Sequence, residues 1–256
     1  MKSSTDDDFH SEIAGTGALH PLTAAAKRAS APPPKPPDPI FQVRQQLARQ
    51  SPQPDRRVAI EAAASPPFEA AMPLLQALGN VPAQLDVAQA DALHRRLMGE
   101  VTSFQSVCQD ARIRYEYIAG ASYALCTALD ESVGNALFDG GGAEEAGMNL
   151  WMARSLAVHF HGDSQGGVKV FRLIGWLALK PQADIDLLEL MFVILRLGFE
   201  GAYRYGRNGR RELENMQYKI HSMVSTCRRN STADLAAHWQ RVEGFIDQAN
   251  RAETSA

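Results

Sequence analysis

The fold is decided by LLELMFVILRLGFEGAYR, residues 187–204, which contains the longest apolar run of the chain. The run from Leu187 to Phe199 is too short to cross a bilayer, and Glu189 and Arg196 interrupt it. It therefore predicts a buried core helix rather than a transmembrane segment. No alternating strand pattern extends beyond a few residues elsewhere, so we predict an all-α fold.

About seven to eight helices are expected, because apolar residues recur at steps of three and four positions along most of the chain. The predicted helices span residues 68–78, 86–104, 115–137, 150–160, 168–179, 185–197, 209–224 and 232–248. The joining segments are short, which favours adjacent antiparallel helices.

The N-terminal quarter has a different composition. Of the 14 prolines, 13 lie at or before Pro82, and large apolar side chains are few in this part. Residues 1–65 are predicted to be a disordered Pro/Ala-rich tail, because burial there cannot offset the entropy of ordering the backbone. Within it, Ile40, Val43 and Leu47 predict a transient helix, with folding on a partner as the alternative. Residues 66–250 are the predicted helical domain, and residues 251–256 end the chain without a transmembrane helix.

Charge and cysteine content exclude some classes of function. The formal net charge of -3 gives no general attraction for nucleic acid, and no long basic stripe is interleaved with aromatic residues. Three well-separated cysteines without CxxC spacing favour a reduced, cytosolic compartment. No cofactor or metal site is predicted.

Three separated signatures carry a family resemblance: YALCTALDE at 123–131, FHGDSQGGVKVF at 160–171 and LLELMFVILRLGFEGAYR at 187–204, which ends in GFEGAYR. Their order and spacing resemble the DotU/TssL family, an inner-membrane-complex component of bacterial type VI secretion with type IVB relatives. The resemblance covers residues 66 to about 243 and implies a domain of two packed three-helix bundles.

The same resemblance implies an assembly subunit without catalysis at the cytoplasmic face of the inner membrane. The implied partners are an IcmF/TssM-type inner-membrane protein, baseplate proteins such as TssK, and further copies of the chain. Family members usually continue into a membrane-spanning helix near the C-terminus. Membrane association is therefore expected through a missing C-terminal anchor or through partners.

Asp130 and Glu131 end the first signature. Adjacent helix positions diverge by about 100°, so the two carboxylates do not form a close acid/base pair. The residue pattern taken alone favours a solvated helix edge. The resemblance instead implies an acidic cleft in which both residues contact a basic element of a partner.

The second signature allows an enzymatic alternative. Gly162, Ser164 and Gly166 fit the G-x-S-x-G nucleophile elbow of α/β-hydrolases. Asp184 or Asp186 and then His221 or His238 follow in the order of a catalytic triad. An elbow requires a parallel sheet, for which the sequence offers no strands.

A structural interpretation of this segment is stronger. Gly166 and Gly167 allow close approach of two backbones, and Asp163 or Ser164 is expected to cap the next helix. Asp163 replaces the glutamate of the family's FHGE motif, and its side chain is shorter by one methylene. His161 belongs to the same structural motif, and its spacing from His159 does not suit a metal site on a helix.

The third signature predicts a turn after the buried helix. Gly198 is expected to end that helix, and Phe199, Glu200, Gly201 and Tyr203 complete the motif. The basic patch that follows is interpreted as a solvated helix entrance or as a lipid or partner contact; it consists of Arg204, Arg207, Arg210 and Arg211. A generic helical scaffold for another envelope process is the remaining alternative.

Overall fold

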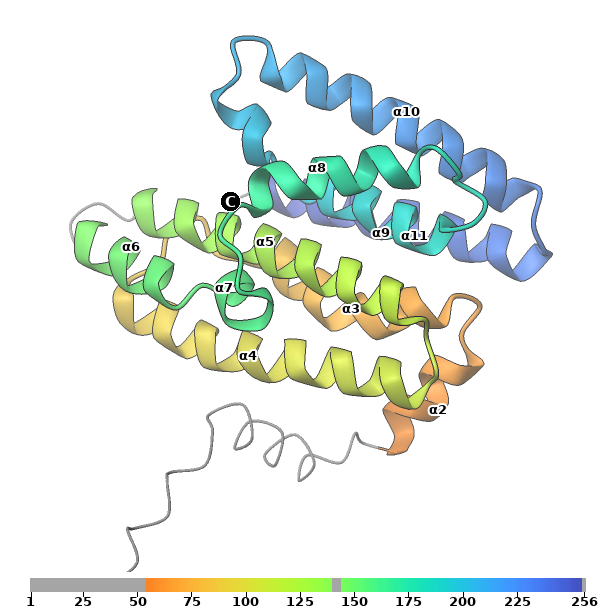
Figure 1. Ribbon diagram of the computed structural model, residues 1–256, viewed down its shortest axis with the longest axis horizontal. Helices are drawn as coiled ribbons and strands as arrows, with labels where there is room; N and C mark the ends of the chain where they lie inside the picture. The colour runs from red at the N-terminus through yellow and green to blue at the C-terminus, as the bar shows by residue number, and fades with distance from the viewer. Residues whose placement is uncertain (1–53, 140–143, 255–256) are drawn as a thin grey trace, which may run out of the picture. The chain divides into compact units, whose positions relative to one another are not determined.

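The computed structural model describes residues 54–139 and 144–254, all drawn in colour in Figure 1. Every regular element in these two ranges is helical, so the all-α prediction is confirmed. The elements are α2 (Pro54–Ala62), α3 (Pro66–Gly79), α4 (Val87–Asp110), α5 (Tyr115–Asp139), α6 (Glu144–Ala153), α7 (Leu156–His161), α8 (Gly166–Leu177), α9 (Ile185–Arg196), the 3-10 helix η1 (Gly201–Tyr205), α10 (Gly209–Arg229) and α11 (Ala233–Thr254).

Helix α9 is the central element. Every residue from Leu187 to Leu195 is buried, and the helix packs against α3, α5, α8, α10 and α11. A helix that is apolar on all sides is stable only when other elements surround it, so the predicted core helix is confirmed. Among the helices of the described ranges, none is long and apolar enough to span a membrane.

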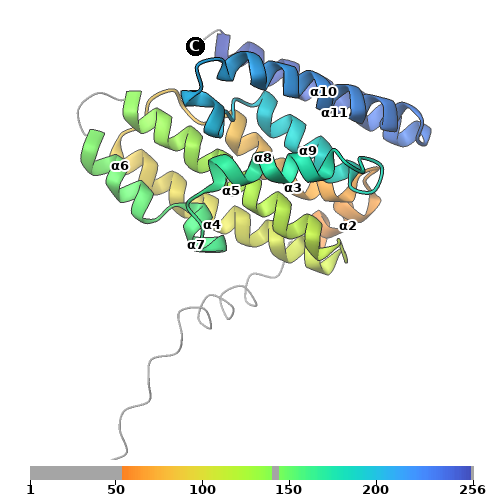
Figure 2. The same cartoon turned by 45° about the horizontal axis from the view of Figure 1, so that its top comes forward.

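Two groups of three helices pack on each other through α9. Helices α3, α4 and α5 are in mutual contact, as are α9, α10 and α11, while α8 packs against α5 and α9. Figure 2 shows α10 and α11 running together along one side of α9. This arrangement agrees with the two packed three-helix bundles that the resemblance implies.

The folded part begins earlier than predicted. Residues 54–65 were assigned to the disordered tail, but α2 lies in this segment and Ile60 is 1% exposed in the core. Arg56 attaches α2 to its neighbours by donating to Ser103 Oγ at 2.9 Å and to the Ala70 carbonyl at 3.3 Å. Ile60 and Arg56 both attach α2 to the folded domain. Composition averaged over 65 residues does not detect such single contacts. The rest of the predicted tail, including Ile40, Val43 and Leu47, lies outside the described residues.

The predicted helix at 150–160 is interrupted. Residues 144–153 form α6, and a second helix, α7, starts at Leu156. Ser155 is the N-cap of α7, and its Oγ accepts a hydrogen bond from the Val158 N–H at 3.2 Å. A serine N-cap satisfies one of the free N–H groups at a helix start, so a new helix begins where the apolar pattern suggested continuity.

A charged network is buried where α9, α10 and α11 meet. Glu189 is fully buried and Arg228 is 2% exposed. Arg228 Nε donates to Glu189 Oε2 at 2.6 Å, and His238 Nε2 lies 2.6 Å from Glu189 Oε1. Arg228 Nη2 also donates to Asp186 Oδ1 at 2.6 Å. The glutamate that interrupts the apolar run is therefore tolerated because an arginine and a histidine reach it from neighbouring helices.

Candidate functional site

A groove of about 910 Å³ is formed by side chains of α5, α6, α7, α8 and η1. Each of the three sequence signatures contributes to its lining. Asp130 and Glu131 come from the first, Ser164, Gly166 and Gly167 from the second, and Gly201 and Arg204 from the third. The fold thus brings together residues that are up to 74 positions apart in the chain, and we refer to this cavity as the signature groove.

Asp130 joins α5 to the start of α7. Its Oδ1 accepts hydrogen bonds from the Leu156 N–H at 2.9 Å and from the indole Nε1 of Trp151 at 3.1 Å. Its Oδ2 accepts from the Ala157 N–H at 2.8 Å. The first N–H groups of a helix have no partner within the helix, so this carboxylate acts as a long-range cap for α7.

Glu131 is a long-range cap for the start of η1 in the same way. Its two oxygens accept hydrogen bonds from the N–H groups of Glu200 and Gly201, both at 2.8 Å. Arg204 Nη2 lies 3.9 Å from the same carboxylate. The adjacent acids therefore diverge, as predicted, and each holds a different wall of the signature groove.

Burial raises the pKa of both carboxyl groups. For Asp130 the pKa rises to about 6, because loss of water outweighs the opposing hydrogen bonds from Ala157, Leu156 and Trp151. For Glu131 the pKa is also raised by burial, while the Glu200 N–H and the Arg204 guanidinium act in the opposite direction. Neither group is a fully solvated surface charge, so the solvated helix edge that the residue pattern favoured does not describe them.

Exposed apolar side chains border the signature groove and were missed by the sequence analysis. Phe138 and Met152 are each 65% exposed, Tyr205 is 89% exposed and Val158 is 39% exposed. We call these four residues the apolar rim. The sequence contained one signal for the apolar rim: Phe138 is an aromatic residue that lies off the apolar stripe of its own helix.

The FHGD segment ends α7 and is attached to α5. Gly162 adopts the left-handed conformation, with φ of 64°. His161 Nε2 lies 3.1 Å from Ser122 Oγ, and its ring packs edge-on against Tyr123. Asp163 forms an ion pair with Lys169 and accepts from the Tyr123 hydroxyl at 3.2 Å.

The predicted capping of α8 by Asp163 or Ser164 is wrong. The N-cap of α8 is Gln165, and its side chain makes no capping hydrogen bond. Asp163 accepts instead from the backbone N–H of Gln165 at 2.8 Å, one position before the helix. The same carboxylate also bonds Lys169 and Tyr123, which fixes it over the loop rather than over the helix start.

The glycines at the start of α8 lie against other parts of the chain. A Cβ placed on Gly166 would lie 2.2 Å from Thr127 Oγ1 and 2.9 Å from Thr127 Cβ. On Gly167, a Cβ would lie 3.5 Å from the Gly201 Cα. Gly201 itself has φ of 50°, and a Cβ there would lie 2.7 Å from the Gly167 carbonyl oxygen. Helix α8 thus lies directly against the Thr127 side chain of α5 at Gly166 and against the backbone of η1 at Gly167.

We expect Gly166→Ala to lower the free energy of unfolding by about 1 to 3 kcal/mol, because the new methyl group overlaps the rigid branched side chain of Thr127. Gly175→Ala in the same helix is the matched control. A Cβ there has no neighbour within 4 Å, so the substitution should stabilise the helix by about 0.5 to 1 kcal/mol. Urea unfolding of both variants checks the pair, and a similar change in both would contradict the close approach at Gly166.

The hydrolase alternative is contradicted by the described structure. Ser164 follows helix α7 rather than a strand, and no strand occurs in residues 54–139 or 144–254. The proposed triad partners are engaged elsewhere: Asp184 pairs with Arg114, and His238 and Asp186 belong to the buried network around Arg228. His221 lies 2.9 Å from Glu243 on α11. In the described part of the chain, no group of three or more His, Cys, Asp or Glu residues is placed to hold a metal ion.

The GFEGAYR segment forms the turn from α9 into η1. Gly198 directly follows the α9 C-cap, Leu197, and has φ of 96°. Phe199 stacks on Phe171 of α8 at 5.5 Å between ring centroids, and Tyr203 meets the same ring edge-on at 4.6 Å. The turn is therefore fixed against α8 by aromatic contacts as well as by Glu131.

The basic patch is only partly available to a ligand. Arg204 pairs with Glu200 at 3.0 Å and donates to Asn135, and Arg210 pairs with Glu214 at 3.1 Å. Arg207 and Arg211 are exposed and make no ion pair with any residue in the described ranges. A lipid or partner contact through these two residues stays a prediction.

Comparisons with known proteins point to one family. The family described as type VI secretion system protein DotU matches residues 68–253. The crystal structure of TssL from Vibrio cholerae is similar, with 27% identity and a TM-score of 0.54 over 63% of this chain and 96% of that one. The crystal structure of SciP/TssL from enteroaggregative Escherichia coli 042 shares 23% identity, with a TM-score of 0.46 over 66% of this chain and 87% of that one. Among curated protein sequences, none matches.

Proposed function

The chain belongs to the DotU family of type VI secretion system proteins, and we propose that it is a structural subunit of the membrane complex, without catalysis of its own. In this role it links an IcmF/TssM-type inner-membrane protein to baseplate proteins such as TssK, at the cytoplasmic face of the inner membrane. The family match over residues 68–253 supports a secretion component in general. The partner assignments come from the resemblance and are part of the proposal.

The signature groove is the observation that best supports a docking function. It combines a volume of about 910 Å³ with the exposed apolar rim and two partly buried carboxylates. Exposed aromatic and aliphatic side chains around a hollow are typical of a protein-binding site. We propose that a partner segment places apolar side chains on the rim and a basic side chain near Asp130 and Glu131.

The arrangement is better suited to docking than to acid/base chemistry. Both carboxylates already accept N–H groups of the chain itself. Their hydrogen bonds keep the walls of the groove in place before a partner arrives, which lowers the entropic cost of binding. A partner then meets a preformed surface.

Replacing two rim residues, Phe138→Ser with Met152→Ser, should weaken capture of at least one of the two partner proteins by about tenfold or more, because central apolar anchors dominate interface energies. Both side chains are 65% exposed, so the variant should remain folded. The measurement is a titrated pull-down of the purified chain with the IcmF/TssM-type protein and the TssK protein of the same bacterium.

Val58→Ser is the matched control, since Val58 is also 65% exposed but lies on α2. It should leave both interactions unchanged. Equal capture of both partners by the rim variant and by the wild type would remove the signature groove as the docking site. Failure of the wild type to capture either partner would count against the linking role itself.

A further inference from the structure

Three of the most exposed large apolar side chains belong to residues at one end of the α5–α8 pair. Trp176 is 75% exposed, Leu179 is 79% exposed and Tyr115 is 74% exposed. The two helices are antiparallel, because Thr127 lies against Gly166 while Gly120 lies against Leu173. Tyr115, at the start of α5, is therefore level with the end of α8. We call Tyr115, Trp176 and Leu179 the apolar end.

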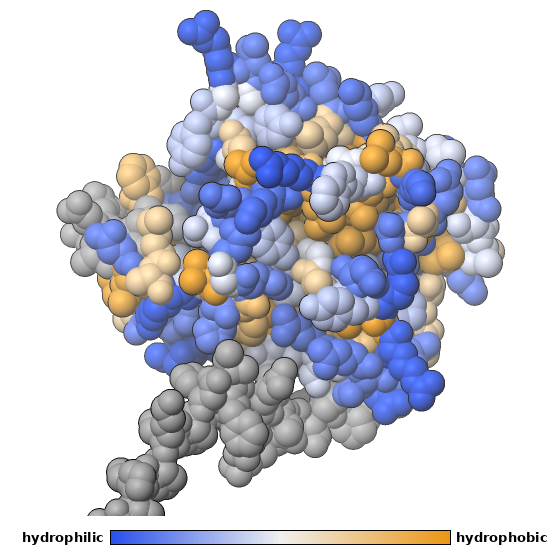
Figure 3. Space-filling model, viewed as in Figure 1, coloured by the Kyte–Doolittle hydropathy of each residue, from blue (hydrophilic) through white to orange (hydrophobic). Residues whose placement is uncertain are grey.

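The apolar end lies in a basic part of an acidic chain. Residues 164–183 contain Lys169, Arg172 and Lys180 and no acidic residue, whereas the whole chain has a net charge of -3. Lys169 is paired with Asp163, but Arg172 and Lys180 make no ion pair within the described ranges. The nearby Asp184 is neutralised by Arg114, which leaves Glu116 as an exposed acid beside Tyr115. Figure 3 shows apolar surface over the α8 region with hydrophilic residues beside it.

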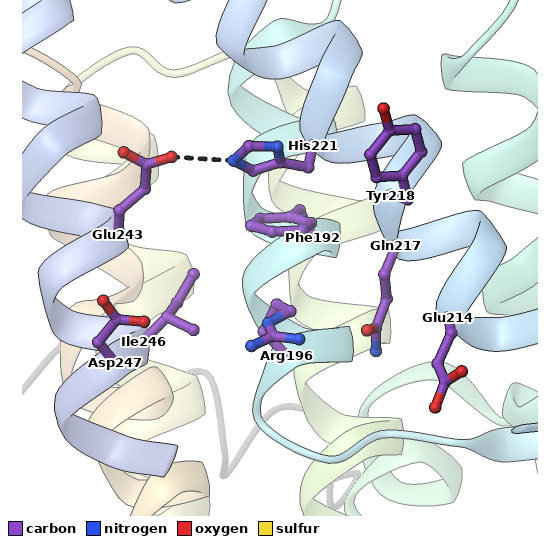
Figure 4. Close-up of a pocket in the computed structure, with 9 residues that line it drawn as sticks. All are labelled: Phe192, Arg196, Glu214, Gln217, Tyr218, His221, Glu243, Ile246 and Asp247. Atoms are coloured by element: carbon purple, nitrogen blue, oxygen red, sulfur yellow. Dashed lines mark hydrogen bonds and ion pairs between the residues drawn. The ribbon is translucent and has the colours of Figure 1, made fainter. Parts of the chain in front are cut away.

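A second cavity, of about 480 Å³, lies between α10 and α11. Its lining combines apolar side chains with carboxylates, which complement the basic neighbours of the apolar end. Figure 4 shows Phe192 of α9 and Ile246 of α11 between carboxylates from both flanking helices. The carboxylates are Glu214, Glu243 and Asp247, and Arg196 is the opposing charge. We call this cavity the acidic groove.

The charges of the acidic groove are only partly compensated. Glu214 pairs with Arg210, whose side chain is 91% exposed, and Glu243 lies 2.9 Å from His221 Nε2. Asp247 is exposed and makes no ion pair with any described residue. The groove therefore has an apolar floor and a negative rim, which suits a basic surface that carries an aromatic anchor.

The serine, histidine and carboxylate beside this groove do not form a catalytic triad. Ser225 Oγ and Glu243 Oε1 approach the same nitrogen, His221 Nε2, at 3.3 and 2.9 Å. A triad needs the nucleophile and the carboxylate on opposite nitrogens of the imidazole. Binding is the function that this geometry supports.

We propose that the apolar end of one copy of the chain docks into the acidic groove of a second copy. Trp176 and Leu179 would cover Phe192 and Ile246, while Arg172 and Lys180 face the rim carboxylates. The two surfaces are different parts of the molecule, so the contact is heterologous and runs head to tail. The inference rests on the proposed assembly role, to which it adds a defined contact between copies.

Sedimentation equilibrium of the purified full chain over a concentration series tests the contact. We expect Trp176→Ala to weaken self-association by about tenfold or more, the effect of removing a central aromatic anchor. Trp151 and Trp239 are each 3% exposed, so a blue shift of tryptophan emission on association would report on Trp176. Val58→Ala, which removes exposed apolar surface on α2, should leave the association unchanged.

Charge-reversed variants test whether the two proposed surfaces contact each other. Arg172→Glu with Lys180→Glu, or Glu214→Lys with Asp247→Lys, should each reduce self-association, because like charges then face each other. The chain that carries all four substitutions should associate again, and so should an equimolar mixture of the two double variants. Arg207→Glu with Arg211→Glu is the matched control and should have no effect.

Two results would overturn the proposal. One is a wild-type chain that stays monomeric at all concentrations, including the case in which it binds phosphatidylglycerol vesicles through Trp176 instead. The other is a set of charge-reversed variants that associate like the wild type. Both results concern the purified chain alone, so they are separable from failure of the rim variant to capture its secretion partners.

Discussion

Arg228→Met is expected to lower the free energy of unfolding by about 3 to 5 kcal/mol, because it leaves Glu189 buried without its cation. Glu189 is 0% exposed, and Arg228 reaches it from α10 at 2.6 Å. His238 contacts the other carboxylate oxygen and cannot replace the guanidinium hydrogen bonds. Removing one partner of a buried ion pair costs far more than the pair contributes as a whole.

Urea unfolding followed by circular dichroism measures this loss. Arg229→Met is the control, since Arg229 is exposed on the same turn of α10, and it should change stability by less than about 0.5 kcal/mol. Adding Glu189→Leu to Arg228→Met should restore much of the loss, because no uncompensated carboxylate then remains in the core. Equal losses in the Arg228 and Arg229 variants would show that the network is not the cause.

The central helix could be predicted from the sequence because its signal is local. Among the nine consecutive buried residues, Leu187 to Leu195, Glu189 is the only charged one. The glycine at 198 likewise marks a helix end through its own backbone freedom. Such features need no knowledge of the rest of the chain.

The signature groove could not be predicted in the same way, because distant residues create it. The start of α7 depends on Asp130, which lies 26 positions before Leu156. The apolar pattern at 150–160 continues without a break and therefore favours one helix, but Ser155 and the distant Asp130 both cap a second helix start at Leu156. The early start of the folded part at α2 has the same origin, since Ile60 is buried by elements that follow it.

The two acids have a second role that distant residues create. The family resemblance implies that Asp130 and Glu131 contact a partner, and their oxygens also accept hydrogen bonds from N–H groups of the chain itself. Reversing their charge would therefore disrupt the groove walls and lose partner binding by an indirect route. Substitutions in the apolar rim test partner docking without removing the hydrogen bonds that hold the groove walls. The role of Asp130 is best tested by measuring the free energy of unfolding.

Asp130→Ala should lower the free energy of unfolding by about 3 kcal/mol, because three donors lose their acceptor: the N–H groups of Leu156 and Ala157 and the Trp151 indole. Hydrogen exchange should accelerate at Leu156 and Ala157 before the rest of the protein opens. Asp86→Ala is the control, since Asp86 caps α4 locally through the Gln89 N–H and should cost only about 1 kcal/mol.

The loss of stability caused by Asp130→Ala should also depend on pH. Because burial raises the pKa of Asp130 from 3.8 to about 6, the folded state binds its proton more tightly than the unfolded state. The contribution of Asp130 to stability is thus greatest below the unfolded pKa and declines as pH rises toward the folded value. The difference in unfolding free energy between wild type and Asp130→Ala should accordingly shrink from about pH 4 to about pH 6 and then stay constant. A difference that grows over this interval would mean that the ionised form is the better cap, and that burial is not what controls this carboxylate.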